Sequence, residues 1–210
     1  MSEEKRILIA CPTHNIKSYC DGEILKAIHN LKVEGQEIII RFDPNEYGST
    51  NACKKQREWF RRYAVEKNFS YLYFMGWDNP ATTEQINKLL SLNLDVVGGI
   101  YWGRYGAENG RVDGAVCWIN GLTREEQNVK MKYGNGVIEV DGMGMDSVLF
   151  SRRAFTSFSY LDWEQNDDDY PAYDILKSKG FKIYADTDVQ IPHYATSNIY
   201  SLNGESITIN

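Results

Sequence analysis

The N-terminal half of the chain alternates between short apolar runs and longer segments of helical spacing, and this alternation restricts the fold more than any other feature. In the longer segments, apolar residues recur every three or four positions, which is typical of an amphipathic helix. The apolar runs cover residues 7–10, 38–40, 71–75 and 95–100, and the helical segments cover residues 23–31, 51–66 and 81–92. Strands and helices in this order predict an α/β fold with a mostly parallel central sheet and right-handed crossovers.

The apolar runs are continuous, which is expected of strands that helices cover on both faces. Residues 101–136 are instead rich in glycine, asparagine and charge, so we expect a smaller mixed second half. Its predicted elements are strands at 115–119, 137–140 and 146–151, a helix at 167–179 and a last strand at 181–184. Gly180 is suited to end the helix, since glycine readily adopts the left-handed conformation found there.

Composition and charge argue against several classes of protein. A chain of 210 residues fits one domain, because domains run to about 100–200 residues. The formal net charge of -6 argues against a broad nucleic-acid-binding surface. No apolar run approaches the ~20 residues of a membrane helix, and the first residues, MSEEKR, lack the apolar core of a signal peptide. We therefore expect a cytoplasmic protein with no transmembrane segment.

The four cysteines are widely spaced and form no C-x-x-C pair, which argues against a zinc site made of thiolates. Cys11 and Cys20 are close enough in sequence for a disulfide to be considered. A buried, unreactive thiol is the favoured state of each, because a reducing compartment is expected.

Polar and aromatic side chains follow each of the first four predicted strands. Ligands of open parallel sheets bind outside the carboxyl ends of the strands, so these side chains should share one site. They are Thr13, His14 and Asn15, then Asp43, then Trp77, Asp78 and Asn79, then Tyr101 to Arg104. Carboxylates, amides and aromatics together favour a nucleotide with a metal ion over an apolar ligand.

Three common fingerprints are absent from the sequence: G-x-G-x-x-G, G-x-x-x-x-G-K-[ST] and G-x-S-x-G. Their absence argues against a dinucleotide-dependent dehydrogenase, a P-loop kinase and a serine hydrolase of the α/β type.

The order of features resembles the GT-A-fold nucleotide-sugar glycosyltransferases, especially their small family-2-like members. The resemblance is carried by residues 7–15, 49–59, 71–90, 95–104, 140–155 and 167–194. It implies a single GT-A-like, Rossmann-like domain over residues 1–210. Within it, residues 5–104 would form a nucleotide-binding half, 105–196 an acceptor and catalytic half, and 197–210 a tail.

The resemblance also implies an activity: transfer of a sugar from a nucleoside-diphosphate-sugar donor to a hydroxyl of a glycan, lipid or protein, with inversion and with the help of a divalent metal. Nucleic acid is not an expected partner. Residues implied to bind the nucleotide are Thr13, Asn15, Asp43, Asn51, Lys55 and Trp77. Thr50 stands where the family has an arginine before the asparagine, so Lys55 is the candidate for a cation beside the phosphates.

The family usually carries Asp-x-Asp after the third strand, whereas this chain has Gly76-Trp77-Asp78 and so lacks the first carboxylate. The resemblance implies that Asp78 binds the metal, and His193 is a candidate second ligand. Carboxylate and imidazole together suit Mn²⁺ somewhat better than Mg²⁺. The alternative for Asp78 is support of a helix start, with Asn79 as N-cap and Pro80 as first residue; for His193 it is a purely structural role.

Inverting transfer needs a base that accepts the proton of the acceptor hydroxyl. The family places an acidic pair about a dozen residues before the glycine that precedes the last strand, which here indicates Asp168 and Asp169. Crowded carboxylates raise the pKa of one member, which suits a base working near neutral pH. An acidic helix start favoured by the helix dipole is the alternative.

Four further residues are candidates for contact with sugars. Gly144 resembles a small-residue turn beneath the donor sugar, where glycine permits close approach of the backbone. Tyr101, Trp102 and Trp163 are candidates for stacking on an acceptor. A plain tight turn and ordinary packing are the respective alternatives.

Two other functions remain open from the sequence. A sugar nucleotidyltransferase would share the fold, but it usually has a Gly-rich loop with a basic residue after the first strand, and residues 11–15 contain neither. A catalytically inactive nucleotide- or sugar-binding module would explain the missing first aspartate.

Overall fold

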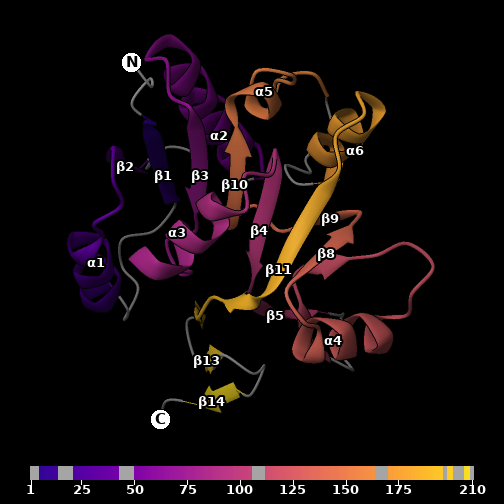
Figure 1. Ribbon diagram of the computed structural model, residues 1–210. Helices are drawn as coiled ribbons and strands as arrows, with labels where there is room; N and C mark the ends of the chain where they lie inside the picture. Colours follow the sequence, from indigo (N-terminus) through magenta and orange to yellow (C-terminus); the bar gives the residue numbers. More distant parts are fainter. Residues whose placement is uncertain are drawn as a thin grey trace.

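A computed structural model describes residues 5–13, 21–42, 50–105, 112–163, 170–195, 198–200 and 206–208 (Figure 1). Its centre is a seven-stranded sheet in the order β2-β1-β3-β10-β4-β11-β8. The strands are β1 (Ile7–Thr13), β2 (Gln36–Phe42), β3 (Tyr71–Met75), β4 (Val96–Ile100), β8 (Val137–Val140), β10 (Ser147–Ser151) and β11 (Ile183–Gln190). β1 pairs in parallel with β2 and β3, and β4 pairs in parallel with β11. The predicted mostly parallel α/β sheet is confirmed.

One strand, β10, interrupts the series of parallel strands in the sheet. β10 lies between β3 and β4 and runs antiparallel to both. The segment was predicted as a strand, but the sequence pattern did not indicate that it would separate the third and fourth parallel strands. β8 is also antiparallel and forms one edge of the sheet.

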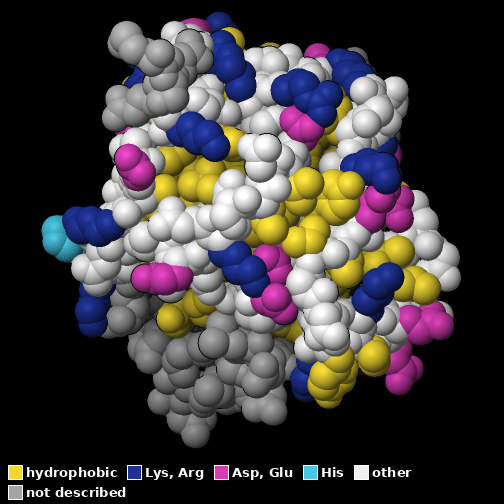
Figure 2. Space-filling view, viewed as in Figure 1, with side chains coloured by type: hydrophobic (Ala, Val, Ile, Leu, Met, Phe, Trp, Pro, Cys, Tyr) yellow, Lys and Arg dark blue, Asp and Glu magenta, His cyan; other side chains and the backbone are white. Residues whose placement is uncertain are grey.

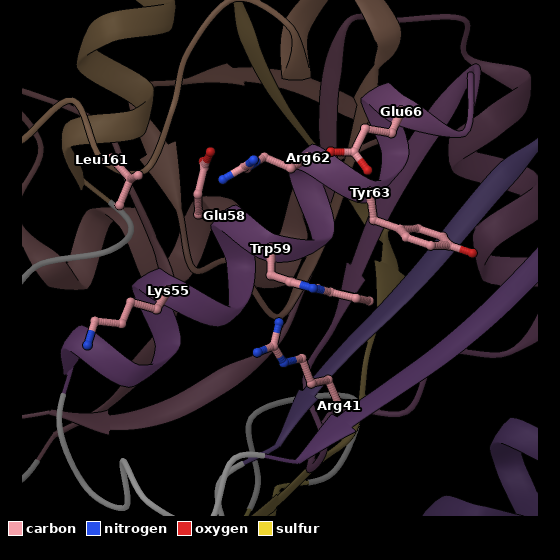
Figure 3. Close-up of a pocket in the computed structure, with 8 residues that line it drawn as sticks. All are labelled: Arg41, Lys55, Glu58, Trp59, Arg62, Tyr63, Glu66 and Leu161. Atoms are coloured by element: carbon pink, nitrogen blue, oxygen red, sulfur yellow. The ribbon is translucent and has the colours of Figure 1, made fainter.

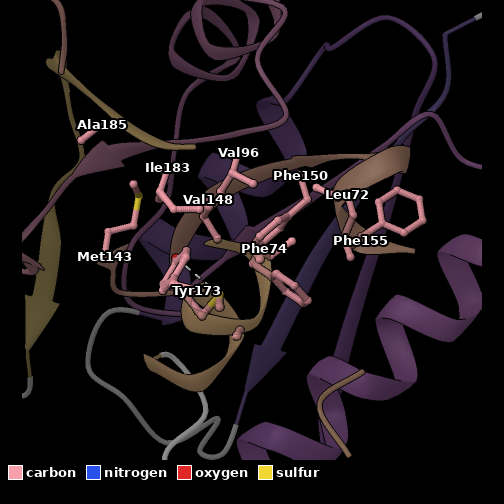
Figure 4. Packing of buried hydrophobic residues seen from close by; sticks show 14 of the residues in the cluster. Leu72, Phe74, Val96, Met143, Val148, Phe150, Phe155, Tyr173, Ile183 and Ala185 are labelled. Atoms are coloured by element: carbon pink, nitrogen blue, oxygen red, sulfur yellow. Dashed lines mark hydrogen bonds between the residues drawn. The ribbon is translucent and has the colours of Figure 1, made fainter. Parts of the chain in front are cut away.

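Helices cover both faces of the sheet, as the continuous apolar strands predicted. They are α1 (Asp21–Asn30), α2 (Thr50–Glu66), α3 (Thr83–Ser91), α4 (Arg124–Tyr133), α5 (Arg152–Phe155) and α6 (Tyr170–Ser178). Side chains of α2, α5 and α6 pack with Leu72, Phe74 and Phe150 on one face (Figure 4). Side chains of α1 and α3 pack with Tyr73 and Leu149 on the other face. Neighbouring residues of β3 thus enter opposite core clusters, and the whole strand is buried.

Helix α4 lies in the region that was expected to hold only short strands and loops, and this expectation was wrong. The helix begins after Thr123, whose side chain accepts a hydrogen bond from the backbone of Glu126 while the Glu126 carboxylate accepts one from the backbone of Thr123. Of its residues, Gln127 and Met131 are buried. A helix with so narrow a buried face leaves little apolar periodicity in the sequence.

The start of α3 also differs from the expectation. Its N-cap is Thr82, with Gln85 completing the reciprocal capping pattern, so Asn79 and Pro80 do not begin this helix. The alternative that Asp78 merely supports a helix capped by Asn79 is therefore wrong. The last strand is longer than predicted and extends to Gln190.

Short strands complete the described part of the chain. They are β5 (Trp102–Tyr105), β6 (Val112–Ala115), β7 (Cys117–Trp118), β9 (Gly142–Met143), β12 (His193–Ala195), β13 (Asn198–Tyr200) and β14 (Ser206–Thr208). Cys11 and Cys117 are buried thiols outside any disulfide, as expected, and Cys20 lies outside the described residues. Among the helices described, none is long and apolar enough to cross a membrane. In Figure 2, lysines and arginines are scattered among acidic side chains around hydrophobic patches.

Candidate functional site at the carboxyl edge of the sheet

Asp78 and His193 meet at the edge where the parallel strands end, although they lie 115 residues apart in the chain. Asp78 follows β3, and His193 begins β12 just after β11. The Asp78 carboxylate Oδ2 lies 3.2 Å from His193 Nε2. The backbone N–H of Tyr194 donates to the Asp78 carbonyl at 2.8 Å, which joins the two segments. The two residues that the sequence singled out as metal ligands are thus in contact, and their metal role stays a prediction.

The second nitrogen of His193 fixes how the ring faces Asp78. Nδ1 lies 2.7 Å from the carbonyl oxygen of Trp102, which can only accept, so Nδ1 carries a proton. In the neutral ring, Nε2 then presents a lone pair to a carboxylate that is also an acceptor. Only a proton or a bound cation between the two atoms makes this contact favourable.

The charge state of His193 follows from its surroundings. Burial opposes the imidazolium, but the Asp78 carboxylate, the Trp102 carbonyl and the charge of Asp146 outweigh it and hold the pKa of His193 above its ordinary value. Asp78 is the more exposed partner, with 43% of its side chain accessible against 19% for His193. The pair therefore has a buried imidazole side and an open carboxylate side.

Asp146 places a second carboxylate near the position where the family's first aspartate is missing. An ideal Cβ built on Gly76 would lie 2.6 Å from Asp146 Cβ and 2.8 Å from its Cγ. The Gly76 backbone N–H donates to the Asp146 carbonyl at 2.9 Å. The absence of a side chain at position 76 thus makes room for Asp146, which precedes β10. Asp146 could not be found from the sequence, because its place beside Gly76 depends on the pairing of β10 with β3.

Arg57 of helix α2 forms an ion pair with Asp146. Its Nη2 lies 2.9 Å from Asp146 Oδ1, and only 5% of the Arg57 side chain is exposed.

The charges of Asp146 and Asp78 also reach Cys11, which lies in β1. Burial is the main cause that raises the pKa of this thiol, and the two carboxylates raise it further. In the described part of the chain, no group of three or more His, Cys, Asp or Glu side chains is arranged to hold a metal ion. Asp78 and His193 are therefore a two-donor set within that part.

Two amide side chains hold the segment that carries His193. Asn79 is fully buried, and its Nδ2 donates to the Pro192 carbonyl at 3.4 Å. Gln85 Nε2 donates to the Gln190 carbonyl at 2.6 Å. Asn79 does not cap a helix, as the alternative for Asp78 required; it links the loop after β3 to the loop after β11 and so helps to position His193 beside Asp78.

Several predicted sugar- and nucleotide-contacting residues are buried. Tyr101, Trp102 and Trp77 are each 8% exposed or less, which corrects the expectation that Tyr101 and Trp102 face an incoming acceptor and places Trp77 in the core. A Cβ at Gly144 would lie 1.8 Å from the Tyr101 hydroxyl, so the glycine accommodates this tyrosine. Trp163 is half-buried and packs on Tyr160, with ring centroids 5.5 Å apart.

The remaining predicted residues are placed only in part. Asn15, Asp43, Asp168 and Asp169 lie outside the described residues. Thr13 ends β1 and Asn51 lies in the first turn of α2, but their side chains are not among those described. Lys55 is exposed and lines a pocket on the flank of α2, whereas Arg57 of the same helix reaches the carboxyl edge.

No family model matches the sequence, and no curated protein matches it. Among solved structures, the crystal structure of A197 from STIV is similar, with a TM-score of 0.63 at 16% sequence identity. The match covers 98% of this chain and 94% of that one. The two chains share a fold. At this identity the likeness concerns the fold alone, and it extends over nearly the whole of both chains.

Proposed function

We propose that this chain is a GT-A-like glycosyltransferase that moves a sugar from a nucleoside-diphosphate-sugar donor to a hydroxyl acceptor with inversion. The observation that carries the proposal is the Asp78–His193 pair at the carboxyl edge of a parallel sheet. Ligands of such sheets bind at this edge. The family resemblance of the sequence supports the same activity.

The donor atoms of the pair fit a divalent ion. Asp78 offers an open carboxylate, and His193 offers an Nε2 lone pair whose direction is set by the hydrogen bond from Nδ1 to Trp102. Metal-binding histidines commonly use their second nitrogen in this way. Oxygen and imidazole ligands together suit Mn²⁺. When bound, such an ion would neutralise the charge that develops on the departing diphosphate.

Other residues of the chain would bind the nucleoside and the phosphates of the donor. Thr13, Asn15, Asp43 and Asn51 would hold the nucleoside at the ends of the first two strands and the start of α2. Lys55, the candidate from the sequence for a cation near the phosphates, lies on the outer face of α2. Arg57 would take that role instead, because it reaches the edge beside Asp146.

Asp168 or Asp169 would act as the base. The acceptor oxygen would attack the anomeric carbon, the bond from that carbon to the diphosphate oxygen would break, and the acceptor proton would pass to the aspartate. Nucleoside diphosphate and the glycosylated acceptor would be the products.

A nucleotide-sugar hydrolysis screen tests the proposal, since many transferases slowly hydrolyse their own donor. With the donor so identified, Asp168→Asn or Asp169→Asn should abolish transfer while nucleotide binding persists, because the base acts only in the chemical step. Asp174→Asn removes an exposed acid of α6 and is the control. Normal transfer rates in both single variants would show that the base is another residue.

One observation favours a second candidate, a binding module without catalysis: Gly76 removes the first carboxylate of the family pattern. This candidate predicts nucleotide-sugar binding with neither hydrolysis nor transfer. The same screen, combined with calorimetry, separates the two.

A further inference from the structure

A second pocket lies on the flank of the sheet, between the end of β2 and the outer face of α2 (Figure 3). Its volume is about 490 Å³, within the range of small-molecule sites. Arg41, Lys55 and Arg62 contribute three cations to its lining, and Trp59, Tyr63 and Leu161 contribute apolar surface.

The pocket is separate from the carboxyl-edge site. Lys55 and Arg57 are two positions apart on α2, which places them on different faces of the helix. Arg57 is buried against Asp146, whereas Lys55, Trp59 and Arg62 are exposed on the outer face. A ligand of this pocket would therefore lie on the opposite side of α2 from Asp146.

Arg41 is held in a stack of planar groups. Its guanidinium carbon lies 4.6 Å from the centre of the Trp59 ring, and Trp59 stacks on Tyr63 with centroids 5.3 Å apart and planes 14° apart. This stack holds the planar guanidinium at the wall of the pocket, where Arg41 can donate charge-assisted hydrogen bonds to an acceptor in the pocket.

Among the described residues, the lining of the pocket carries an excess of positive charge. Two acids, Glu58 and Glu66, line it against the three cations. Glu58 is already bound by Arg61 through two contacts of 2.8 Å and by the Tyr160 backbone N–H at 3.0 Å. Guanidinium groups with a lysine nearby match the geometry and charge of a phosphate. Leu161 and Trp59, 62% and 39% exposed, offer apolar surface to the rest of the ligand.

We propose that this pocket binds the phosphate-monoester group of an organic ligand, with Arg41 and Arg62 as the principal contacts. The proposal does not depend on the glycosyltransferase function. The phosphate can belong to a free metabolite or to a lipid headgroup, and the recognition chemistry is the same for both.

Calorimetry with glycerol 3-phosphate, and co-sedimentation with phosphatidylcholine vesicles with or without phosphatidic acid, test the proposal on the full chain. The wild type should bind glycerol 3-phosphate, or bind vesicles only when they contain phosphatidic acid; the first result indicates a free ligand and the second a lipid. Arg62→Gln and Arg41→Gln should each weaken that binding by roughly tenfold or more, because each removes a charge-assisted contact.

Lys130→Gln, which removes an exposed cation of α4, is the matched control and should bind as the wild type does. Asp78→Asn should also leave this binding unchanged, which separates the pocket from the carboxyl-edge site. Arg62 is exposed, so its variant should fold, and a thermal melt checks this. Binding to neither probe, or binding that both arginine variants leave intact, would overturn the proposal.

Discussion

The positions of the side chains at the carboxyl edge are set by contacts with residues that are distant in sequence. The position of Asp78 at this edge could be predicted because it lies in the loop after the buried strand β3, and that of His193 because it lies in the segment after the last strand, β11. Asp146 and Arg57 could not be predicted, because their places come from the contact of Asp146 with Gly76 and from the ion pair between Asp146 and Arg57, which no local pattern encodes. Asn79 was expected at this edge, but its hydrogen bond to Pro192 was not. Glycine at position 76 is informative only once Asp146 is known to lie against it.

Gly76 has no room for a side chain beside Asp146. Gly76→Ala forces the new Cβ against Asp146, and overpacking of this kind costs about 1–3 kcal/mol. The free energy of unfolding in urea should fall by that amount. Gly114→Ala is the control, because the atoms nearest to its Cβ, in Arg124 and Asn128, would lie at 3.1 Å rather than 2.6 Å, so its stability should fall less. Equal stability of the two variants would contradict the proposed contact.

At the scale of elements, the accuracy of sequence reasoning depended on how much of each element is buried. β3 and β4 are buried along their whole length, so each appears as a continuous apolar run. Helix α4 buries little, and apolar spacing therefore missed it. Its signal was the capping pattern of Thr123 and Glu126, which also marks the true start of α3 at Thr82 and Gln85.

The N-cap of α3 should contribute measurably to the stability of the fold. Thr82→Ala removes the hydroxyl that accepts from the Gln85 backbone N–H, and loss of such a cap costs about 1 kcal/mol. Chemical denaturation should show this decrease in unfolding free energy. Thr82→Ser retains a hydroxyl and should remain close to the wild type. A Thr82→Ala protein as stable as the serine variant would show that the cap contributes nothing.

At the scale of the whole molecule, the alternating pattern predicted the parallel sheet and the edge where its ligands should bind. It did not predict that β10 enters between β3 and β4, because strand order depends on long-range pairing rather than on periodicity. That insertion brings Asp146 to the edge and so defines one side of the site. The fold likeness to A197 from STIV extends over 98% of this chain.

We propose that Asp78 and His193 support metal-dependent binding of a nucleoside diphosphate at the carboxyl edge of the sheet. The most direct measurement is calorimetry of a panel of nucleoside diphosphates, with and without Mn²⁺, on the wild type, Asp78→Asn and the control Asp174→Asn. We expect Mn²⁺ to tighten binding of one diphosphate by roughly tenfold or more in the wild type and the control, because the ion adds charge-assisted contacts to the phosphates. Asp78→Asn should lose that gain. Absence of diphosphate binding, or a Mn²⁺ effect that survives in Asp78→Asn, would contradict the claim.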